Sequence, residues 1–344
     1  MLIVYDPRPH IRGKLSNQTW RVLLTGGAGF IGSHVAEGLL RQGAELTIVD
    51  DLDEFYSPDW KRANLEEVRR AGDFQFLQAD ICDPEPLRKL FAGMHFDALV
   101  HLAARAGVRP SLEQPRLYER VNVAGTLNLL DLCREFGVSK VLFGSSSSVY
   151  GVSNRIPFSE AQADLRPISP YAATKLAGEL LCYTYAHLYR LSVVCLRFFT
   201  VYGPRQRPDL AIHKFTSQIE SGKPIHLYGD GNSGRDYTYV DDIVAGVLAA
   251  LEYLSRDGSA MFEVFNLGNS HPVKLVEMVA ALERATGRTT TYSHEPDQPG
   301  DVPLTWADIS KASRLLGYKP TTSLDEGLQR FVTWYRATPR SQRA

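Results

Sequence analysis

The chain has 344 residues, which is long enough for one large domain or two closely joined ones. Hydrophobic residues make up 44% and charged residues 22%, and the net charge is −1, so nothing favours nucleic acid or a membrane surface as the main partner. No run approaches about 18 apolar residues, which argues against a membrane span. The four cysteines form no Cys-x-x-Cys pair, so we expect reduced thiols in a cytoplasmic globular protein.

The first motif in chain order is a glycine-rich turn. Residues 21–25 predict a buried strand that runs into Gly26, Gly29 and Gly32, and residues 33–41 follow with helical apolar spacing. Strand, glycine turn and helix together are typical of a dinucleotide-binding site. In such a site Gly26 permits the tight turn, Gly29 lets the backbone approach the diphosphate, and Gly32 lets the helix pack closely on the strand.

An acidic residue follows at the spacing that a dinucleotide site requires. The next expected strand, residues 46–49, ends at Asp50, 18 residues after Gly32. A carboxylate there accepts hydrogen bonds from both ribose hydroxyls and repels a 2′-phosphate, which favours NAD over NADP. The helix after the glycines adds partial positive charge for the phosphates. The alternative is a glycine turn in some other α/β protein.

Strands and helices then continue to alternate. Further strands are expected at residues 74–78, 96–102, 140–144 and 191–196. Such alternation implies a parallel sheet with right-handed crossovers, and ligands bind at the carboxyl ends of its strands. Asp80 follows the third strand, where it could meet the adenine amino group, and Ala103 and Ala104 follow the fourth. We therefore predict an α/β fold, a Rossmann-type doubly wound parallel sheet with a smaller mixed α/β lobe for the substrate.

A candidate acid/base pair lies at residues 171–175. Ser169 and Pro170 form a helix-start signal, and a helix that begins there projects Tyr171 and Lys175 from one face. A phenol beside an ammonium suits general acid/base chemistry, because the positive charge favours tyrosinate and lowers the phenol pKa. The alternative is coincidence, since chance predicts about half a Tyr-x-x-x-Lys match in a chain of this composition.

Together these motifs resemble those of a known family. They are the spaced glycines, Asp80, His101-Leu-Ala-Ala104, the serine run 145–148, the Tyr171/Lys175 pair, and residues 197–204 and 234–243. From about residue 21 to about residue 335 the chain resembles the extended short-chain dehydrogenase/reductase family, in its nucleotide-sugar epimerase branch. Residues 104–111, 199–208 and 298–302 look most like those of UDP-glucuronate 4-epimerases.

The resemblance implies NAD as cofactor and assigns catalytic roles. The implied cofactor-binding residues are Gly26, Gly29, Phe30, Ile31, Gly32, Asp50, Asp80, Ile81, Leu102, Ala103, Ala104, Asn122, Tyr171 and Lys175. Tyr171 would take the proton from the sugar 4-hydroxyl, and Lys175 would hold the nicotinamide ribose and lower the Tyr171 pKa. Ser146 would hydrogen-bond the reacting oxygen, although in a run of four serines the matching residue could also be a neighbour one position away. The alternative for the run is a polar loop after a strand.

The resemblance also implies a set of substrate-binding residues. They are Ser147, Ser148, Thr200, Arg207, Tyr228, Arg235 and Asp301. Tyr228 would lie against the uracil, Arg235 would bind a diphosphate oxygen, and Asp301 would reach the uridine ribose. Gln298 stands where many relatives have arginine, so Arg207 or Arg205 is expected to supply the missing charge.

Arg207 is also the candidate for holding a substrate carboxylate, because guanidinium and carboxylate pair in a planar, bidentate way. Oxidation at C4 of a glucuronate gives a β-keto acid, which loses carbon dioxide when its carboxylate bond aligns with the carbonyl π system. An epimerase must hold the carboxylate away from that alignment. The alternative is that Arg205 and Arg207 are solvated loop charges. Sugar 4,6-dehydratases carry Asp-Glu at the positions of Ser147 and Ser148, so dehydration is disfavoured.

The regular alternation ends after Pro204, which sets the expected domain boundaries. Residues 1–19, without a secretory pattern, form an N-terminal extension; residues 20–203 form the NAD-binding Rossmann domain, to which about 236–268 return; 204–338 form mainly the UDP-sugar lobe; and 339–344 are a tail. In this second half the sequence predicts a helix within 208–222, a strand at 224–228, a helix at 241–251 and a last helix capped by Ser323. The histidines have no ligand spacing, so no metal is expected.

A second copy of the chain is an expected partner. Residues 121–136 are apolar almost all round, so a helix there must be covered on two sides. The resemblance implies a homodimer in which this helix and the Tyr171 helix form a four-helix bundle. The alternative is burial of the helix inside the monomer.

The sequence thus favours an enzyme, an NAD-dependent UDP-sugar 4-epimerase and so an isomerase. Its expected reaction converts UDP-glucuronate to UDP-galacturonate through a transient 4-keto intermediate. The alternatives are the same reaction on UDP-glucose or UDP-N-acetylglucosamine, decarboxylation of UDP-glucuronate, and a non-catalytic NAD-binding sensor. Nucleic acid and membranes are not expected as partners.

Overall fold

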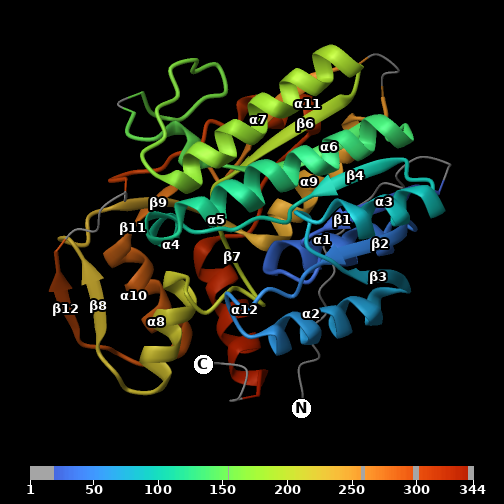
Figure 1. Ribbon diagram of the computed structural model, residues 1–344. Helices are drawn as coiled ribbons and strands as arrows, with labels where there is room; N and C mark the ends of the chain where they lie inside the picture. Colours follow the sequence, from blue (N-terminus) through green and yellow to red (C-terminus); the bar gives the residue numbers. More distant parts are fainter. Residues whose placement is uncertain (1–18, 154, 257–259, 297–301, 340–344) are drawn as a thin grey trace.

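The computed structural model describes residues 19–153, 155–256, 260–296 and 302–339 and centres on a seven-stranded parallel sheet (Figure 1). The strands lie in the order β10-β6-β5-β4-β1-β2-β3. Their bounds are β1 Arg21–Thr25, β2 Glu45–Asp50, β3 Phe74–Gln78, β4 Ala98–His101, β5 Lys140–Ser146, β6 Ser192–Phe198 and β10 Phe262–Leu267. The predicted fold class, a doubly wound parallel sheet with a smaller mixed lobe, is confirmed.

Helices cover both faces of this sheet, as its inner strands require, because β1, β2 and β4 are buried on both sides. On one face lie α1 Phe30–Arg41, α2 Pro58–Ala71 and α9 Val240–Tyr253, and on the other α3 Pro84–Gly93, α6 Gly125–Phe136 and α7 Pro170–Tyr189 (Figure 1). Alternate strand residues divide between two cores: Leu24 and Leu142 pack toward α1 and α9, while Leu23 and Val141 pack toward α6 and α7.

The strand order reverses at β1. From β1 the chain proceeds to β2 and β3 on one side of the sheet and then returns to β4, β5 and β6 on the other. At such a switch point the loops after neighbouring strands turn in opposite directions and leave a crevice at the carboxyl edge. The crevice here lies beyond Thr25 and His101, which are paired in register at the ends of β1 and β4.

The rest of the chain forms the smaller lobe and closes the sheet. Its strands are β7 Thr200–Tyr202, β9 Gly234–Tyr239 and β11 Pro272–Lys274 in one sheet, and β8 Ile225–Tyr228 and β12 Tyr292–Glu295 in another. Its helices are α8 Ala211–Glu220, α10 Leu275–Thr286 and α12 Leu324–Ala337, whereas α11 Ser310–Leu316 packs against α9 and β10 of the large sheet. Between β9 and β11 the chain returns to the large sheet, where β10 pairs with β6 and α9 packs against α1 at Gly38.

One predicted helix is interrupted. Residues 121–136 are expected to form a single helix, but a π-helical turn, η1, occupies Arg120–Ala124 before α6 begins. Within this wider turn the carbonyl oxygen of Asn122 accepts a hydrogen bond from the Thr126 hydroxyl, at 2.7 Å. Two short helices, α4 Val108–Glu113 and α5 Pro115–Glu119, precede it.

The helix that carries the candidate acid/base pair begins where the sequence predicts. The Ser169 side chain caps α7 by accepting from the backbone N–H of Ala172 at 3.2 Å, and Pro170 occupies the first turn. Ser323 caps α12 in the same way, accepting from the N–H of Glu326. Because α7 starts at Pro170, Tyr171 and Lys175 lie one turn apart above the end of β5, where a 3-10 turn, η2, spans Ser147–Tyr150.

Close packing of α7 on the sheet makes Gly178 a sensitive position. A Cβ atom at Gly178 would lie 2.4 Å from Cζ of Phe143, so Gly178→Ala should overpack this contact. We expect the substitution to lower the free energy of unfolding by about 1–3 kcal/mol in urea-melt experiments. Gly93→Ala is the matched control, because its Cβ meets nothing within 4 Å. An unchanged or higher stability of Gly178→Ala would contradict the packing described.

Candidate active site

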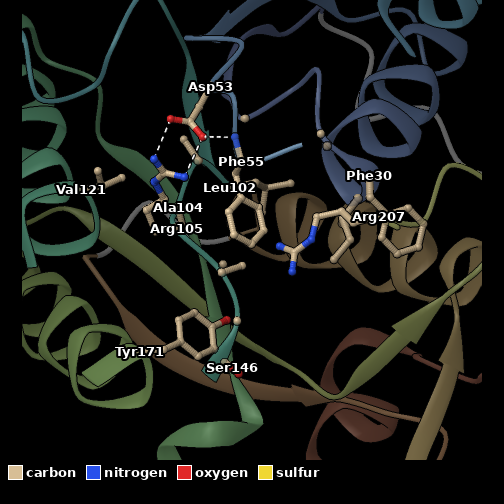
Figure 2. A pocket seen from close by; sticks show the side chains of 18 of the residues that line it. Phe30, Asp53, Phe55, Leu102, Ala104, Arg105, Val121, Ser146, Tyr171 and Arg207 are labelled. Atoms are coloured by element: carbon tan, nitrogen blue, oxygen red, sulfur yellow. Dashed lines mark hydrogen bonds and ion pairs between the residues drawn. The ribbon is translucent and has the colours of Figure 1, made fainter. Parts of the chain in front are cut away.

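A cavity of about 560 Å³ opens at the carboxyl edge of the large sheet (Figure 2). It brings together thirteen of the fourteen expected cofactor residues, two of which, Tyr171 and Lys175, are also candidate catalytic residues, with Ser146 and four of the expected substrate residues. They are Gly26, Gly29, Phe30, Ile31, Gly32, Asp50, Asp80, Ile81, Leu102, Ala103, Ala104, Ser146, Tyr171, Lys175, Ser147, Ser148, Thr200 and Arg207. The cavity runs from the glycine turn to the lobe.

The glycine turn forms a cradle that no side chain could enter. Gly26 has φ +74°, and a Cβ on it would lie 2.6 Å from the backbone nitrogen of Ala103. A Cβ on Gly32 would lie 2.0 Å from the carbonyl oxygen of Gly26. The N-cap of α1 is Gly29, which has no capping side chain, so the helix N-terminus faces the cavity without an acceptor of its own. This geometry fits the diphosphate of a dinucleotide.

Asp50 has a structural contact that the sequence did not suggest. Its carboxylate accepts from the backbone N–H of Ala28 at 3.0 Å and of Leu52 at 2.9 Å, so it also fixes the glycine turn. Burial raises the pKa of Asp50, and these two hydrogen bonds act in the opposite direction. The side chain still borders the cavity, where its remaining lone pairs can meet ribose hydroxyls.

The Tyr171 phenol lies inside the cavity beside Ser146 (Figure 2). Burial raises the pKa of Tyr171, while the hydrogen bond with the Ser146 hydroxyl and the charge of Arg207 act to lower it. The expectation that Lys175 depresses the Tyr171 pKa is therefore not met here: the net direction is upward, because loss of water around a phenolate outweighs nearby charge.

Lys175 is buried and directed toward the sheet. Its ammonium donates to the carbonyl oxygen of Gly144 at 2.7 Å and lies 5.1 Å from the ring centroid of Phe143. Burial lowers the pKa of Lys175 to about 8, and the negative charge of Glu179 acts in the opposite direction. A lysine with such a pKa changes its charge readily near neutral pH.

The serines after β5 point in different directions. The Ser145 hydroxyl donates to Glu179 at 2.5 Å, behind the cavity. The Ser146 hydroxyl donates to Ser148 at 3.1 Å and accepts from the Ser148 N–H at 3.2 Å, and it is also the hydroxyl bonded to Tyr171. Ser146 is thus the member of the run that contacts the phenol.

Arg207 extends from the lobe into the same cavity (Figure 2). Its guanidinium forms a bidentate pair with Asp209, at 3.0 Å from Nε and 2.8 Å from Nη2. The side chain is only 15% exposed, and its guanidinium lies 5.2 Å from the ring centroid of Phe55. Asp209 holds the pKa of Arg207 above its usual range despite burial, which opposes this. A fixed positive charge therefore faces the cavity, within electrostatic range of Tyr171.

Sequence reasoning missed the loop between β2 and α2. Asp53 forms an ion pair with Arg105 at 2.7 Å, and the Phe55 ring lies between the guanidinium groups of Arg105 and Arg207, at 5.8 and 5.2 Å (Figure 2). The loop thus covers one side of the cavity. The loop follows a strand at the carboxyl edge of the sheet, and that position alone could have indicated a place near the site. Its contacts could not be foreseen, because they join residues about 50 and 150 positions apart.

Several candidate residues lie apart from the lining of this cavity. The Asn122 amide pairs with the backbone of Arg105, accepting from its N–H at 2.7 Å and donating to its carbonyl at 2.9 Å. Tyr228 has the Arg109 guanidinium 4.5 Å from its ring centroid. Arg235 donates to the carbonyl of Gly234. Asp301 and Gln298 lie outside the described residues.

Arg205 is not available as a phosphate ligand of this cavity. It packs against α1, where it pairs with Glu37 at 2.6 Å and contacts Nδ1 of His34 at 2.7 Å. Its side chain is 9% exposed and its backbone has φ +65°. The expectation that Arg205 could compensate for Gln298 has no support here, because its guanidinium is buried against α1 and does not line the cavity.

The described residues contain neither a metal-binding cluster nor a membrane-spanning helix. Within the described ranges, no three His, Cys, Asp or Glu side chains gather in a way that could hold a metal ion. Nor does any helix in those ranges have the length and apolar character needed to cross a membrane.

The sheet, the glycine cradle and the Tyr171/Lys175 pair define a Rossmann-type dinucleotide-binding protein. A family model described as GDP-mannose 4,6 dehydratase matches residues 23–331. The chain belongs to that family, which is part of the extended short-chain dehydrogenase/reductases that include nucleotide-sugar epimerases and dehydratases.

Individual relatives are similar over nearly the whole chain. UDP-glucuronate 4-epimerase 4 of Arabidopsis thaliana is 45% identical over 333 residues, covering 93% of this chain and 76% of its own. UDP-glucuronate 4-epimerase of Thermodesulfobacterium geofontis is 44% identical, covering 91% and 95%. A crystal structure of UDP-glucuronic acid 4-epimerase from Bacillus cereus, in complex with UDP-glucuronic acid and NAD, superimposes with a TM-score of 0.86 at 38% identity, covering 92% and 99%.

Proposed function

We propose that the protein is an NAD-dependent isomerase that converts UDP-glucuronate to UDP-galacturonate by epimerisation at C4. The observation that carries this proposal is one cavity that holds a diphosphate cradle, the Ser146–Tyr171 pair and the Arg207 guanidinium. Relatives 44–45% identical are named UDP-glucuronate 4-epimerases, and the Bacillus cereus enzyme was crystallised with that substrate and NAD, which supports the assignment.

The residues near the glycine turn fit NAD. Gly26, Gly29 and Gly32, with Phe30 and Ile31 at the start of α1, would hold the diphosphate. Asp50 would accept from the adenosine ribose, and its negative charge would exclude a 2′-phosphate. Asp80 and Ile81 would border the adenine, while Leu102, Ala103, Ala104 and Lys175 would lie along the nicotinamide half.

Proton transfer falls to Tyr171. The phenolate would take the proton of the sugar 4-hydroxyl, with the Ser146 hydroxyl holding both oxygens in place. Bound NAD supplies a reversible hydride acceptor at C4. The buried Lys175 would hold the nicotinamide ribose, while the charge of Arg207 favours the phenolate. After the 4-keto sugar rotates in the cavity, the same hydride would return to the opposite face of C4, and Tyr171 would give its proton to the C4 oxygen to form the epimeric alcohol.

Arg207 would distinguish a uronate from a neutral sugar. A planar guanidinium pairs with a carboxylate at fixed geometry, and Arg207 is held in place by Asp209 and Phe55. Holding the carboxylate out of line with the 4-keto group would suppress decarboxylation. Ser147, Ser148 and Thr200 would complete the sugar site, and Tyr228, Arg235 and Asp301 would contact the uridine diphosphate from the lobe.

A homodimer in the cytoplasm fits the exposed surface and the thiols. The helix α7 exposes Leu180 by 61%, Tyr183 by 55% and Leu188 by 58%, and the neighbouring helix α6 exposes Leu127 by 36%. Apolar side chains at this spacing suit a four-helix bundle with a second copy. The four cysteines are free thiols, three of them buried, which fits a reducing compartment.

Replacing the phenol hydroxyl tests the catalytic assignment. Tyr171→Phe should lower kcat by about 10²- to 10⁴-fold, because it removes the group that accepts and returns the proton. NAD binding, followed by tryptophan fluorescence, should stay within twofold of the unmodified protein. Tyr292→Phe, which alters an exposed phenol of β12, is the control and should keep full activity. Retained turnover in Tyr171→Phe would remove Tyr171 from its role.

Arg207→Gln tests the choice of sugar. Loss of a charge-assisted hydrogen bond, worth about 1.5–3 kcal/mol, should lower kcat/KM for UDP-glucuronate by roughly ten- to a hundredfold. The kcat/KM for UDP-glucose, which has no carboxylate, should fall less, because it loses only the effect of the Arg207 charge on Tyr171. The measurement is the ratio of the two values, so a general loss of activity does not imitate the result. Equal falls for both sugars would contradict the carboxylate contact.

Leu180→Glu tests the dimer. A buried charge at the centre of the α7 face should dissociate the dimer to monomers of about 38.4 kDa in light-scattering chromatography. Tyr292→Glu places a charge on an equally exposed position of β12 and should leave the dimer intact. A monomeric unmodified protein, or a dimeric Leu180→Glu variant, would contradict this interface.

A further inference from the structure

His101 is a buried histidine that the proposed reaction does not use. It is the last residue of β4 and lies in register with Thr25, the last residue of β1. Its Nδ1 is 2.7 Å from the Thr25 hydroxyl, and its Nε2 is 2.9 Å from the Thr126 hydroxyl of α6. The ring is 2% exposed, so both nitrogens are satisfied by these partners alone.

The partners fix which nitrogen carries the proton. The Thr126 hydroxyl donates its one proton to the carbonyl oxygen of Asn122 at 2.7 Å, so it can only accept from His101. Nε2 therefore carries the hydrogen, and Nδ1 accepts from the Thr25 hydroxyl. That hydroxyl oxygen in turn accepts from the backbone N–H of Ala103 at 3.3 Å. Burial, together with the charge of Lys175, lowers the pKa of His101 to about 3, which fits a neutral ring.

One end of this hydrogen-bond chain lies under the glycine cradle. Thr25 immediately precedes Gly26, and Ala103 provides the backbone atoms against which Gly26 packs. The other end reaches the catalytic helix. The Asn122 amide, in the π-helical turn, donates to the Thr174 hydroxyl at 3.0 Å, and that hydroxyl donates to the carbonyl oxygen of Tyr171 at 2.8 Å.

A second contact joins the same two parts. The His101 ring packs on Phe143 with 5.7 Å between ring centroids. Phe143 in turn lies beneath the ammonium of Lys175 and against Gly178, both on α7. His101 is therefore linked to three elements of the site. Thr25 connects it to the strand that leads into the cradle, Thr126 to the π-helical turn, and Phe143 to the face of the catalytic helix.

We propose that His101 is a positioning residue which, with Thr25, Thr126 and Asn122, sets the distance between the cofactor cradle and Tyr171. This inference rests on the proposed function, because it assigns these residues to the geometry of that reaction. Transfer between a sugar and a cofactor needs the reacting atoms within about 3–3.5 Å, and a 1 Å displacement can cost about a hundredfold in rate. A fully satisfied buried network is the kind of contact that maintains such a distance.

Thr126→Val is the sharpest test, because it replaces the hydroxyl with a methyl group of similar volume. It should remove both hydrogen bonds of Thr126 and lower kcat by about ten- to a hundredfold, with KM and the NAD dissociation constant within twofold. Thr126→Ser keeps the hydroxyl and should restore kcat to within twofold. The matched control is Thr216→Val, since the Thr216 hydroxyl is also buried and donates to a carbonyl one turn back, at 2.8 Å, in α8.

His101→Phe gives an independent variant of the same network. It keeps the ring contact with Phe143 but loses both hydrogen bonds, so kcat should fall as in Thr126→Val. In the double variant the two losses should not multiply, because both act through one chain of bonds. If the two losses multiply in the double variant, His101 and Thr126 act independently. If Thr126→Val keeps its kcat and loses as much thermal stability as Thr216→Val, the role of Thr126 is purely structural. Either result would overturn the proposal.

A readout that needs no turnover separates this inference from the proposed function. In protein labelled with ¹³Cζ-tyrosine, the Tyr171 signal, assigned by its loss in Tyr171→Phe, should move in Thr126→Val and stay in place in Thr126→Ser and Thr216→Val. An unmoved signal in Thr126→Val would overturn the positioning role even if UDP-glucuronate is converted. A moved signal with no conversion of UDP-glucuronate would leave the positioning role standing and refute the substrate assignment.

Discussion

The close approach of three backbone segments is the constraint on which the site depends. Gly26, Gly32 and Ala103 come so near one another that a Cβ on either glycine would lie within 2.0–2.6 Å of backbone atoms. Backbone atoms cannot move aside as a side chain can, so the end of β1, the start of α1 and the end of β4 form one rigid unit. The cradle for a dinucleotide diphosphate follows directly from this contact.

Buried polar contacts extend that rigidity to the rest of the cavity. Behind the serines, Arg197 and Glu179 form a bidentate ion pair with side chains only 4% and 5% exposed, and Ser145 donates to the same carboxylate. Breaking such a buried pair from one side costs about 3–5 kcal/mol, so β6, α7 and the end of β5 are held together. Ser146 and Tyr171 thereby face each other across an interior that cannot easily shift.

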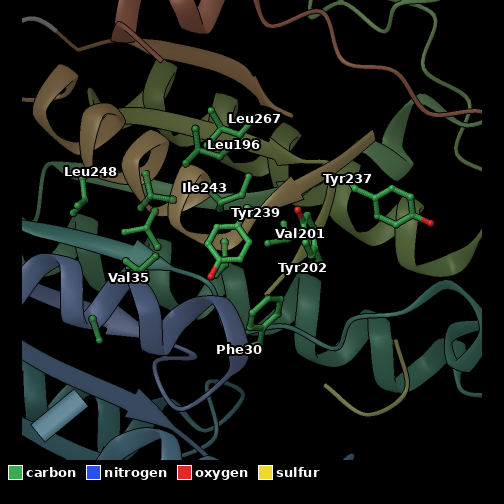
Figure 3. Close-up of a cluster of buried hydrophobic side chains, with 14 of the residues drawn as sticks. Phe30, Val35, Leu196, Val201, Tyr202, Tyr237, Tyr239, Ile243, Leu248 and Leu267 are labelled. Carbon is green, nitrogen blue, oxygen red and sulfur yellow. The ribbon is translucent and has the colours of Figure 1, made fainter. Parts of the chain in front are cut away.

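The lobe that carries Arg207 is not an independent attachment. Figure 3 shows Phe30 and Val35 of α1 in the same apolar cluster as Val201 and Tyr202 of β7 and Tyr239 of β9, together with Ile243 and Leu248 of α9. One core thus runs from the Rossmann helices into the lobe. Because the lobe shares this core, the position of Arg207 relative to the cradle is set by packing as well as by its pair with Asp209.

Local patterns in the sequence predicted most of the fold and the centre of the site. The strands, the glycine turn, the Ser169 cap and the Tyr171/Lys175 spacing each depend on neighbouring residues, so their outcome could be worked out in advance. The loop with Asp53 and Phe55, the π-helical turn at Asn122 and the pairing of Arg205 with Glu37 could not, because each rests on partners distant in the chain. The upward direction of the Tyr171 pKa likewise depends on burial, which three-dimensional packing decides.

The most direct test of the account is proton NMR of UDP-glucuronate incubated with the purified protein and NAD, following the anomeric and H4 signals over time. The account predicts growth of the UDP-galacturonate signals to a stable ratio, without carbon dioxide release and without accumulating NADH. A pentose or free 4-keto product would contradict the role given to Arg207 and indicate decarboxylation instead. An unchanged spectrum beside conversion of UDP-glucose or UDP-N-acetylglucosamine would contradict the uronate assignment.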